Sequence, residues 1–309
     1  MTTLTDLNNF DLLRVAGNDA ARFLQGQLSC NLDKLKADQS LTGTYCNIKG
    51  RVIADLRVFM MDGTVYLLCA HGLAAPLKQT LDKYIVFFKA DITVVTEQYE
   101  CYGVHGDGAA ATISELFGAT PDQSGEVLAV EGAAGAVIAL PDSAPRYLLL
   151  LPHGHSWLER LEQYGVTDDL EEWELAEIRQ GIVHVTPATQ ETFTPQLLNY
   201  DLNGLIDFRK GCYTGQEIVA RMHYRGVAKK RLYRAGVKHA NPSAESRVMH
   251  GDKVVGEVVS AALVGGDHYE LLAILPRDLV EQRAELMLLN EGDSVCSPLE
   301  LLSLPADAA

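Results

Sequence analysis

The segment KGCYTGQE, Lys210 to Glu217, places a cysteine and a tyrosine between two glycines and runs directly into the basic stretch IVARMHYRGVAKKR. The chain has 309 residues and a formal net charge of −15, so a concentration of cations at one place is unusual for it. Glycine admits backbone conformations that are closed to other residues and lets the chain approach a ligand or another backbone closely. The segment therefore predicts either a reactive site or a tight structural turn.

Cys212 is the chemically distinctive residue of this segment. Arg209 and Lys210 precede it, and nearby cations favour the thiolate, which is the nucleophilic form of cysteine. Gln216 and Glu217 add an amide and a carboxylate a few residues further on. The alternative is a small buried thiol that packs inside a turn. From the residues alone, a functional and a structural Cys212 both remain open.

Basic residues continue beyond the segment. Eight lie between positions 209 and 234 against the single acid Glu217: Arg209, Lys210, Arg221, Arg225, Lys229, Lys230, Arg231 and Arg234. An acidic surface repels the dense negative charge of a nucleic acid duplex, so the cluster favours a small anionic ligand or a locally docked partner. A solvated face of a strand and loop is the alternative. Three tyrosines lie in or near this stretch: Tyr200, Tyr213 and Tyr224. Their rings could stack on a ligand, or they could be buried with hydrogen-bonded hydroxyls.

Length and composition limit the class of protein. A chain of 309 residues exceeds the usual size of one domain, so we expect two or three. Its apolar runs are too short to span a membrane, and MTTLTDLNNF does not resemble a secretory or transit leader, which predicts a cytoplasmic protein. The six cysteines form no CxxC pair, which predicts free thiols and no metal site. His153 and His155 lack a third ligand nearby, so we expect an exposed loop there.

Several elements can be predicted from periodicity. Alternating side chains predict a strand over residues 52–60, in which Asp55 and Arg57 share a face. Apolar residues at helical spacing predict a helix over 73–85, and helices capped at 18 or 19 and at 167 or 168, the last ended by Gly181. The glycines of GVHGDG at 103–108 do not match the dinucleotide fingerprint GxGxxG. Short strands after 231 predict a small antiparallel barrel, with a domain boundary at 228–231.

Taken together, these residues resemble a known family. KGCYTGQE is similar to the KGCYxGQE signature of the YgfZ proteins, folate-binding relatives of the glycine-cleavage T-protein, which is an aminomethyltransferase. Other stretches match in order over nearly the whole chain: FLQGQ at 23–27, CNIKGRVIADLRVF at 46–59, LDKYIVFFKADI at 81–92, TPQLLNYD at 194–201 and ARxxxRG at 220–226. The resemblance implies a multi-lobed α+β cloverleaf fold. Residues 1–229 would form a T-protein-like folate-binding region of two interleaved α+β lobes, and residues 230–309 a C-terminal antiparallel β-barrel.

The resemblance also implies a function. A YgfZ-like protein would bind tetrahydrofolate or a one-carbon derivative and support the assembly or repair of iron-sulfur enzymes, including tRNA-modifying ones. Its partners would be folate and, transiently, those client enzymes or assembly proteins, with no general nucleic-acid binding, no membrane and no metal. Cys212 would be a functional thiol. The folate-binding residues would be Asp55, Asn199, Tyr200, Lys210, Gly211, Tyr213, Gly215, Gln216, Glu217, Arg221 and Arg225.

Two positions depart from the T-protein pattern. T-proteins carry an acidic pair in a stretch similar to VIADL, whereas here Ala54 precedes Asp55. Arg179, two residues before Gly181, occupies the place of their pterin-binding glutamate, and a guanidinium cannot accept hydrogen bonds from a pterin ring. T-protein activity is therefore not expected. A folate-dependent one-carbon transferase that acts on another amine substrate remains the alternative function.

Overall fold

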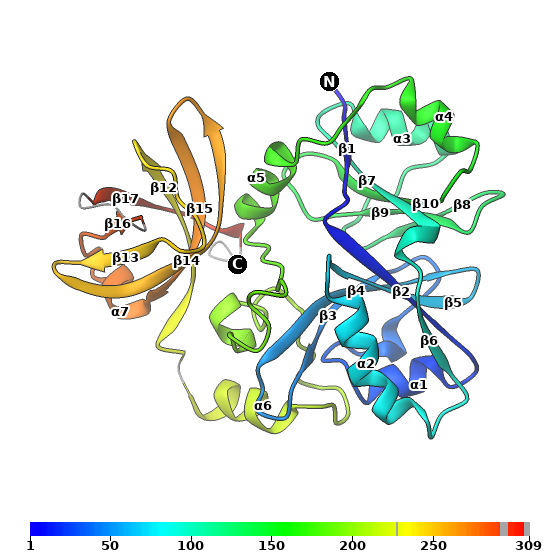
Figure 1. Ribbon diagram of the computed structural model, residues 1–309, viewed down its shortest axis with the longest axis horizontal. Helices are drawn as coiled ribbons and strands as arrows, with labels where there is room; N and C mark the ends of the chain where they lie inside the picture. The colour runs from blue at the N-terminus through cyan, green and yellow to red at the C-terminus, as the bar shows by residue number, and fades with distance from the viewer. Residues whose placement is uncertain (227, 291–295, 306–309) are drawn as a thin grey trace. The chain divides into compact units, whose positions relative to one another are not determined.

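The computed structural model describes residues 1–226, 228–290 and 296–305 (Figure 1). The chain divides into two compact units, each built from several stretches of sequence. Unit 1 comprises Met1–Leu170, His184–Thr192 and Gly204–Ile218, and unit 2 comprises Glu171–Val183, Phe193–Asn203 and Val219–Ala309.

The first sheet of unit 1 has five antiparallel strands in the order β3-β4-β5-β2-β6. They are β2 (Phe10–Ala16), β3 (Leu41–Cys46), β4 (Val52–Met61), β5 (Thr64–Ala70) and β6 (Asp91–Val94). Helices α1 (Ala20–Gln25) and α2 (Ala74–Ile85) bury apolar side chains in the core of this sheet. The predicted strand at 52–60 and helix at 73–85 are thus confirmed as β4 and α2.

The second sheet of unit 1 has six strands in the order β11-β1-β7-β10-β9-β8. They are β1 (Thr3–Asp6), β7 (Tyr99–His105), β8 (Val127–Val130), β9 (Gly135–Ala139), β10 (Arg146–Pro152) and β11 (Val166–Thr167). Helix α3 (Ala109–Phe117) contributes Ile113 and Leu116 to its core, and α4 (Trp157–Glu162) contributes Leu161. Short 3-10 helices complete the unit at η1 (Leu32–Lys34) and η2 (Thr96–Gln98).

The glycine-rich loop at 103–108 packs against the first residues of the chain. Gly106 has φ +98°, and a Cβ there would lie 2.6 Å from the carbonyl oxygen of Met1. Gly108 donates its N–H to the same oxygen at 3.2 Å. The glycines therefore allow two backbones to approach each other closely.

Unit 2 contains a closed barrel of six strands in the order β12-β15-β14-β13-β16-β17. They are β12 (Lys230–Lys238), β13 (Arg247–His250), β14 (Lys253–Gly265), β15 (His268–Pro276), β16 (Met287–Leu289) and β17 (Ser297–Leu302). The remaining elements are α5 (Glu171–Gln180), η3 (Pro195–Leu198), α6 (Gln216–Arg225), whose first residues belong to unit 1, and α7 (Arg277–Glu281). The predicted antiparallel barrel is confirmed.

One predicted helix start is confirmed and one is wrong. Asp19 is the N-cap residue of α1, although its carboxylate accepts the N–H of Lys89 and none from the first turn of the helix. The predicted cap of α5 at 167 or 168 is wrong: Thr167 pairs with Thr5 in the parallel strand β11, and the helix begins at Glu171. Its predicted end at Gly181 is confirmed, and that glycine has φ +67°.

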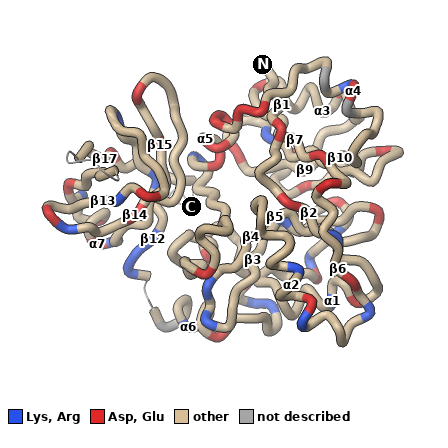
Figure 2. Tube along the Cα trace, in the orientation of Figure 1, with Lys and Arg blue, Asp and Glu red and all other residues tan. Residues whose placement is uncertain are grey.

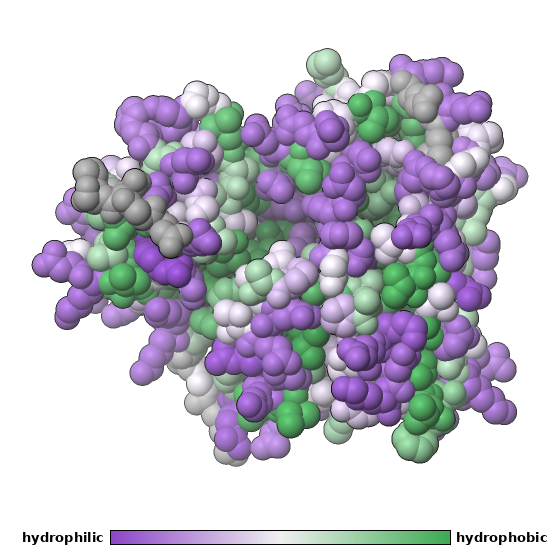
Figure 3. All heavy atoms as spheres, viewed as in Figure 1, coloured by the Kyte–Doolittle hydropathy of each residue, from purple (hydrophilic) through white to green (hydrophobic). Residues whose placement is uncertain are grey.

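Charged and apolar residues are spread unevenly over the surface. Lysine and arginine gather at the start of β12, while acidic residues gather in the first turn of α5 (Figure 2). Val86 and Phe87 are strongly exposed in the turn between α2 and β6, and Figure 3 shows apolar surface at that corner. Among the described residues, no helix is long and apolar enough to span a membrane.

Candidate functional site

The signature segment is anchored by Lys210. Its ammonium group donates to the carbonyl oxygens of Gln25, Leu28 and Cys30 at 2.8, 2.5 and 2.7 Å. An ammonium has three hydrogens, so these main-chain acceptors occupy all of its donor positions. Burial lowers the pKa of Lys210 to about 8, and the nearby Cys30 thiol opposes that fall. Lys210 therefore fastens the segment to the chain that follows α1, rather than presenting its charge to solvent.

The two glycines of the signature have different surroundings. Gly215 has φ +82°, and a Cβ there would lie 2.4 Å from the carbonyl oxygen of Asn47 and 3.1 Å from the Cβ of Cys46. A Cβ on Gly211 would meet nothing within 4 Å. Gly215 is thus required by a left-handed turn packed against the β3–β4 connection, whereas Gly211 lies in open space.

The adjacent residues Cys212 and Tyr213 face different environments. Cys212 is exposed and not disulfide-bonded, so the alternative of a buried turn cysteine is wrong. Tyr213 is buried, its ring lies 5.3 Å from the Lys210 ammonium, and its hydroxyl has no hydrogen-bond partner among the described residues. Burial raises the pKa of Tyr213, and the Cys46 thiol nearby adds to the rise.

Asp55 forms a second polar centre in unit 1. Its carboxylate is 6% exposed and has a partner on each oxygen: the N–H of Val185 at 2.7 Å and the Nδ1 of His184 at 2.6 Å. The His184 side chain is 28% exposed, and Phe10 packs against its ring edge-to-face at 5.1 Å. A carboxylate therefore fixes the orientation of an imidazole that remains partly accessible.

The segment that carries His184 follows β4 along its first half. The N–H of Glu191 donates to the carbonyl oxygen of Val52 at 2.8 Å, and the side chain of Gln190 donates to that of Ile53 at 3.3 Å. Residues 52–56 of β4 are not paired with β5, whose register begins at Arg57. Residues 184–192, distant in sequence, thus supply partners to β4 beside Asp55.

In unit 2, the predicted residues Asn199 and Tyr200 hold the framework. The Nδ2 of Asn199 donates to the carbonyl oxygen of Leu232 at 2.8 Å. The hydroxyl of Tyr200 donates to the carbonyl oxygen of Val183 at 2.7 Å. Asn199 also has φ +57°, in the left-handed region that asparagine tolerates better than most residues. These bonds join the TPQLLNYD segment to β12 and to the chain after α5.

A second buried carboxylate centre lies in unit 2 and is formed by Glu270 with Arg179 and Arg234. Glu270 on β15 accepts from Arg179 at 3.0 Å and from Arg234 at 2.8 Å. Burial alone would raise the pKa of Glu270, but the hydrogen bonds from Arg179 and Arg234 outweigh it and hold the pKa below its ordinary value. Arg179 thus docks α5 on the barrel.

The remaining predicted residues lie on α6. Gln216 and Glu217 open the helix, with Glu217 exposed, and Arg221 is exposed one turn further on. The side chain of Arg225 lies outside the described part of the structure.

Within unit 1, the structure brings together residues that are distant in sequence: Asp55 with His184, and Lys210 with the carbonyls after α1. Sequence reasoning missed His184, because a single histidine in GIVHVT has no neighbouring motif to reveal its partner. Among the described residues, no group of three His, Cys, Asp or Glu side chains could hold a metal ion.

The fold defines the class of protein. The structure matches that of the glycine cleavage system aminomethyltransferase T from Bartonella henselae with a TM-score of 0.81, covering 99% of this chain and 86% of that one at 16% sequence identity. The model of the GCVT N-terminal domain matches residues 1–132. The chain therefore has the aminomethyltransferase fold of the T-proteins.

Sequence similarity narrows the class to one family. The chain is 30% identical over 310 residues to the tRNA-modifying protein YgfZ of Sodalis glossinidius, covering 98% of this chain and 92% of the relative. The protein of that name from Hamiltonella defensa is 32% identical over 236 residues, or 75% and 69% of the two chains. The chain belongs to the YgfZ family, which confirms the resemblance carried by KGCYTGQE.

Proposed function

We propose that this protein is a cytoplasmic tetrahydrofolate-binding accessory protein that supports iron-sulfur enzymes, including tRNA-modifying ones. The observation that carries the proposal is the Asp55–His184 pair, a buried carboxylate that orients a partly exposed imidazole in unit 1. Family membership, and the name tRNA-modifying protein YgfZ that its relatives carry, support the link to tRNA modification. Tetrahydrofolate, when bound, would supply a carrier for one-carbon units.

The residues present fit a reduced pterin. Its ring presents N–H groups that need acceptors, and its glutamate tail needs cations or other donors. Asp55 is 6% exposed and both of its oxygens have partners, so we propose that it positions His184 and that the imidazole meets the ring. Glu217 and Gln216, which open α6 and belong to unit 1, would add acceptors.

Other predicted residues take a supporting role in this proposal. Lys210, Asn199 and Tyr200 each direct their side-chain donors to main-chain carbonyls. Gly215 lets the signature turn pack against Asn47. We propose that Lys210 and Gly215 shape the site in unit 1 and that Asn199 and Tyr200 hold the framework of unit 2. We also propose that the exposed Cys212 is the thiol through which the protein acts on its clients.

Ligand-dependent stability tests folate binding directly. A ligand that binds only the folded state stabilises it by about 2.7 kcal/mol at a hundredfold excess over Kd. Tetrahydrofolate should therefore raise the melting temperature and give a calorimetric binding signal. An unchanged melting temperature together with no heat of binding at millimolar reduced folate would contradict the proposal.

Two substitutions separate the roles of the imidazole. His184→Asn keeps a donor near the place of Nδ1, so it retains the bond to Asp55, but it removes the outer nitrogen. We expect it to weaken tetrahydrofolate binding about tenfold, equivalent to about 1.4 kcal/mol, with little loss of stability. His184→Gln, whose amide reaches further out, should recover part of the affinity. Equal affinity of the wild type and His184→Asn would reduce His184 to a structural partner of Asp55.

The aminomethyltransferase fold also supports an alternative function, that of a one-carbon transferase that acts on an amine. Against T-protein activity stand Ala54, where T-proteins have an acid, and Arg179, which is bound to Glu270. Loss of a positioned carboxylate commonly lowers acid-base catalysis by a factor of about 100 to 10,000. Formation of methylene-tetrahydrofolate from an aminomethylated carrier at rates near those of a T-protein would favour the alternative.

A further inference from the structure

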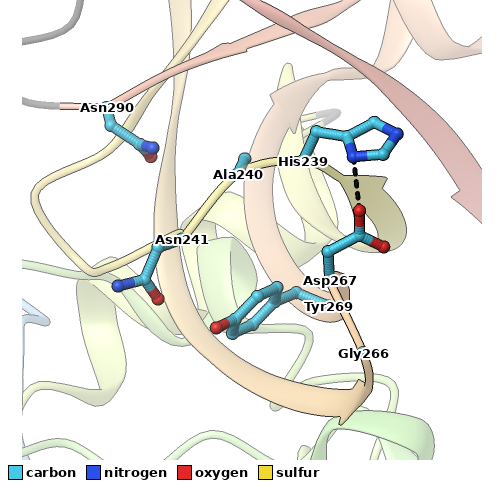
Figure 4. Close-up of a pocket in the computed structure, with 7 residues that line it drawn as sticks. All are labelled: His239, Ala240, Asn241, Gly266, Asp267, Tyr269 and Asn290. Atoms are coloured by element: carbon cyan, nitrogen blue, oxygen red, sulfur yellow. Dashed lines mark ion pairs between the residues drawn. The ribbon is translucent and has the colours of Figure 1, made fainter.

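The barrel of unit 2 has a pocket that contains none of the residues discussed so far. It has a volume of about 550 Å³ and is lined by three separate stretches of chain (Figure 4). One follows β12 and contributes His239 and Asn241, the second is the β14–β15 hairpin with Asp267 and Tyr269, and the third contributes Asn290 after β16.

The lining is fixed by internal bonds. His239 has φ +57°, its N–H donates to the carbonyl oxygen of Asp267 at 3.1 Å, and its Nδ1 forms an ion pair with the Asp267 carboxylate. The Oδ1 of Asn290 accepts from the hydroxyl of the buried Ser246 at 2.8 Å. Tyr269 packs against the barrel core. The three stretches are thus held in place before any ligand arrives, which limits the entropy lost on binding.

The lining is polar and aromatic, and its carboxylate is already engaged by a neighbouring side chain. Asp267 pairs with His239, so the neutral side chains of Asn241 and Tyr269 are left to meet a ligand. Figure 4 shows the hydroxyl of Tyr269 pointing to the side on which the amide of Asn241 lies, with the ion pair on the other side of Ala240. An aromatic ring beside a carboxamide offers one flat face and one adjacent donor and acceptor.

We propose that this pocket binds a nucleobase, stacked on Tyr269 and hydrogen-bonded through its edge by Asn241. Bases stack on aromatic side chains, and asparagine pairs in bidentate fashion with adenine, whose edge places an acceptor beside an amino donor. Adenine is therefore the favoured base.

The base could belong to a free nucleoside or nucleotide or to an unpaired position of an RNA. The net charge of −15 opposes the RNA backbone in general, so recognition would depend on the base itself. This proposal is independent of folate binding, because its residues are separate from Asp55, His184 and the signature segment.

Saturation-transfer NMR with adenosine as the probe tests the proposal on the full chain. Adenosine should show saturation transfer at millimolar concentration, and Asn241→Ala should weaken binding about tenfold by removing a bidentate pair. Tyr269→Leu, which keeps an apolar side chain against the core, should weaken it to a similar degree. Asn8→Ala, at an exposed position in unit 1, is the matched control and should bind as the wild type does.

Further ligands distinguish the sources of the base. If an RNA provides it, a labelled hexa-adenylate should bind at least tenfold more tightly than adenosine and weaken with salt; equal affinity for the two favours a free nucleoside or nucleotide. The proposal is overturned if adenosine gives no signal, if Asn241→Ala and Tyr269→Leu bind it as well as Asn8→Ala does, or if glucose competes equally.

Discussion

Two buried carboxylates, Asp55 in unit 1 and Glu270 in unit 2, have hydrogen-bond partners of different chemistry. Asp55 is 6% exposed and accepts from one main-chain N–H and from His184. Glu270 is 5% exposed and accepts from Arg179 and Arg234. The two arginines carry permanent charge, whereas an imidazole is charged only when it is protonated.

The difference indicates which centre is structural. A carboxylate neutralised by two guanidinium groups has no remaining task beyond joining α5 and β12 to β15. A carboxylate that holds a partly exposed imidazole fixes the orientation of a side chain that solvent can reach. The Asp55 centre is therefore the one that we propose to act on a ligand.

The largest expected effect is the loss of stability in Glu270→Gln. The neutral amide leaves Arg179 and Arg234 without a counter-charge, and removal of one partner of a buried ion pair typically destabilises by about 3 kcal/mol or more. Urea denaturation measures the change in the free energy of unfolding. Glu300→Gln, at an exposed carboxylate on β17, should change it by less than about 0.5 kcal/mol. Equal stability of the two variants would mean that the arginine cluster is not structural.

Lys210→Met should have the next largest effect, a loss of about 2 kcal/mol in the free energy of unfolding. The methionine keeps the apolar stem but leaves the carbonyls of Leu28 and Cys30 without their donor, and an unsatisfied buried acceptor costs about 1 to 3 kcal/mol. The matched control is Lys34→Met, which removes the ion pair between a largely exposed lysine and Asp207 and should cost about 1 kcal/mol or less. A loss of tetrahydrofolate binding without a loss of stability would instead give Lys210 a direct role at the ligand.

The sequence predicts much of this architecture because local patterns determine it. The alternation in β4, the helical spacing in α2 and the short strands of the barrel are properties of neighbouring residues. The partners of Asp55 and Lys210 lie 129 and 180 or more positions away, at His184 and at Cys30 with the residues before it. No local pattern encodes such pairs, so the cation beside Cys212 was expected to face the thiol and instead faces main-chain carbonyls.

The two glycines of the signature provide a third test, in which Gly215→Ala should lower the free energy of unfolding by about 1.5 kcal/mol. In Gly215→Ala the residue must keep φ +82° and place its Cβ 2.4 Å from the Asn47 carbonyl oxygen, so both strain and a clash are expected. Gly211→Ala meets nothing within 4 Å and should be nearly neutral. Chemical denaturation of both variants measures the difference. Similar stability of the two would show that the turn can rearrange.

A smaller effect is expected in acid. The pKa of Glu270 in the folded protein lies below its value of about 4.3 in the unfolded chain, because Arg179 and Arg234 outweigh the effect of burial. The unfolded state therefore binds the proton first as pH falls, so the stability contributed by Glu270 is present above about pH 4.3 and is lost below it. Between pH 6 and pH 3, the free energy of unfolding should decrease less steeply in Glu270→Gln than in the wild type. Parallel curves would contradict the assignment.

Cys212→Ser should have the smallest effect on stability, because the side chain is exposed and a surface substitution usually changes the free energy of unfolding by less than about 0.5 kcal/mol. Its effect on thiol chemistry should be large. Burial raises the pKa of Cys30 and Cys46 to about 11 and that of Cys101 to about 12, which suppresses their thiolates at neutral pH. A thiol reagent should therefore modify Cys212 in the native protein well before these three, and Cys212→Ser should remove that fast phase.

The same variant decides whether the exposed thiol has a function. In cells that lack their own YgfZ, Cys212→Ser should fail to restore the activity of iron-sulfur enzymes although it is as stable as the wild type and still binds tetrahydrofolate. Cys296→Ser, at a partly exposed cysteine of unit 2, is the control and should restore activity fully. Because Cys212→Ser leaves Lys210, Gly215 and the Asp55–His184 pair intact, a failure would be due to the missing sulfur and not to a disturbed site. Full restoration by Cys212→Ser would show that the signature segment acts only as a scaffold, and the comparison between a structural and a functional centre would then depend on His184 alone.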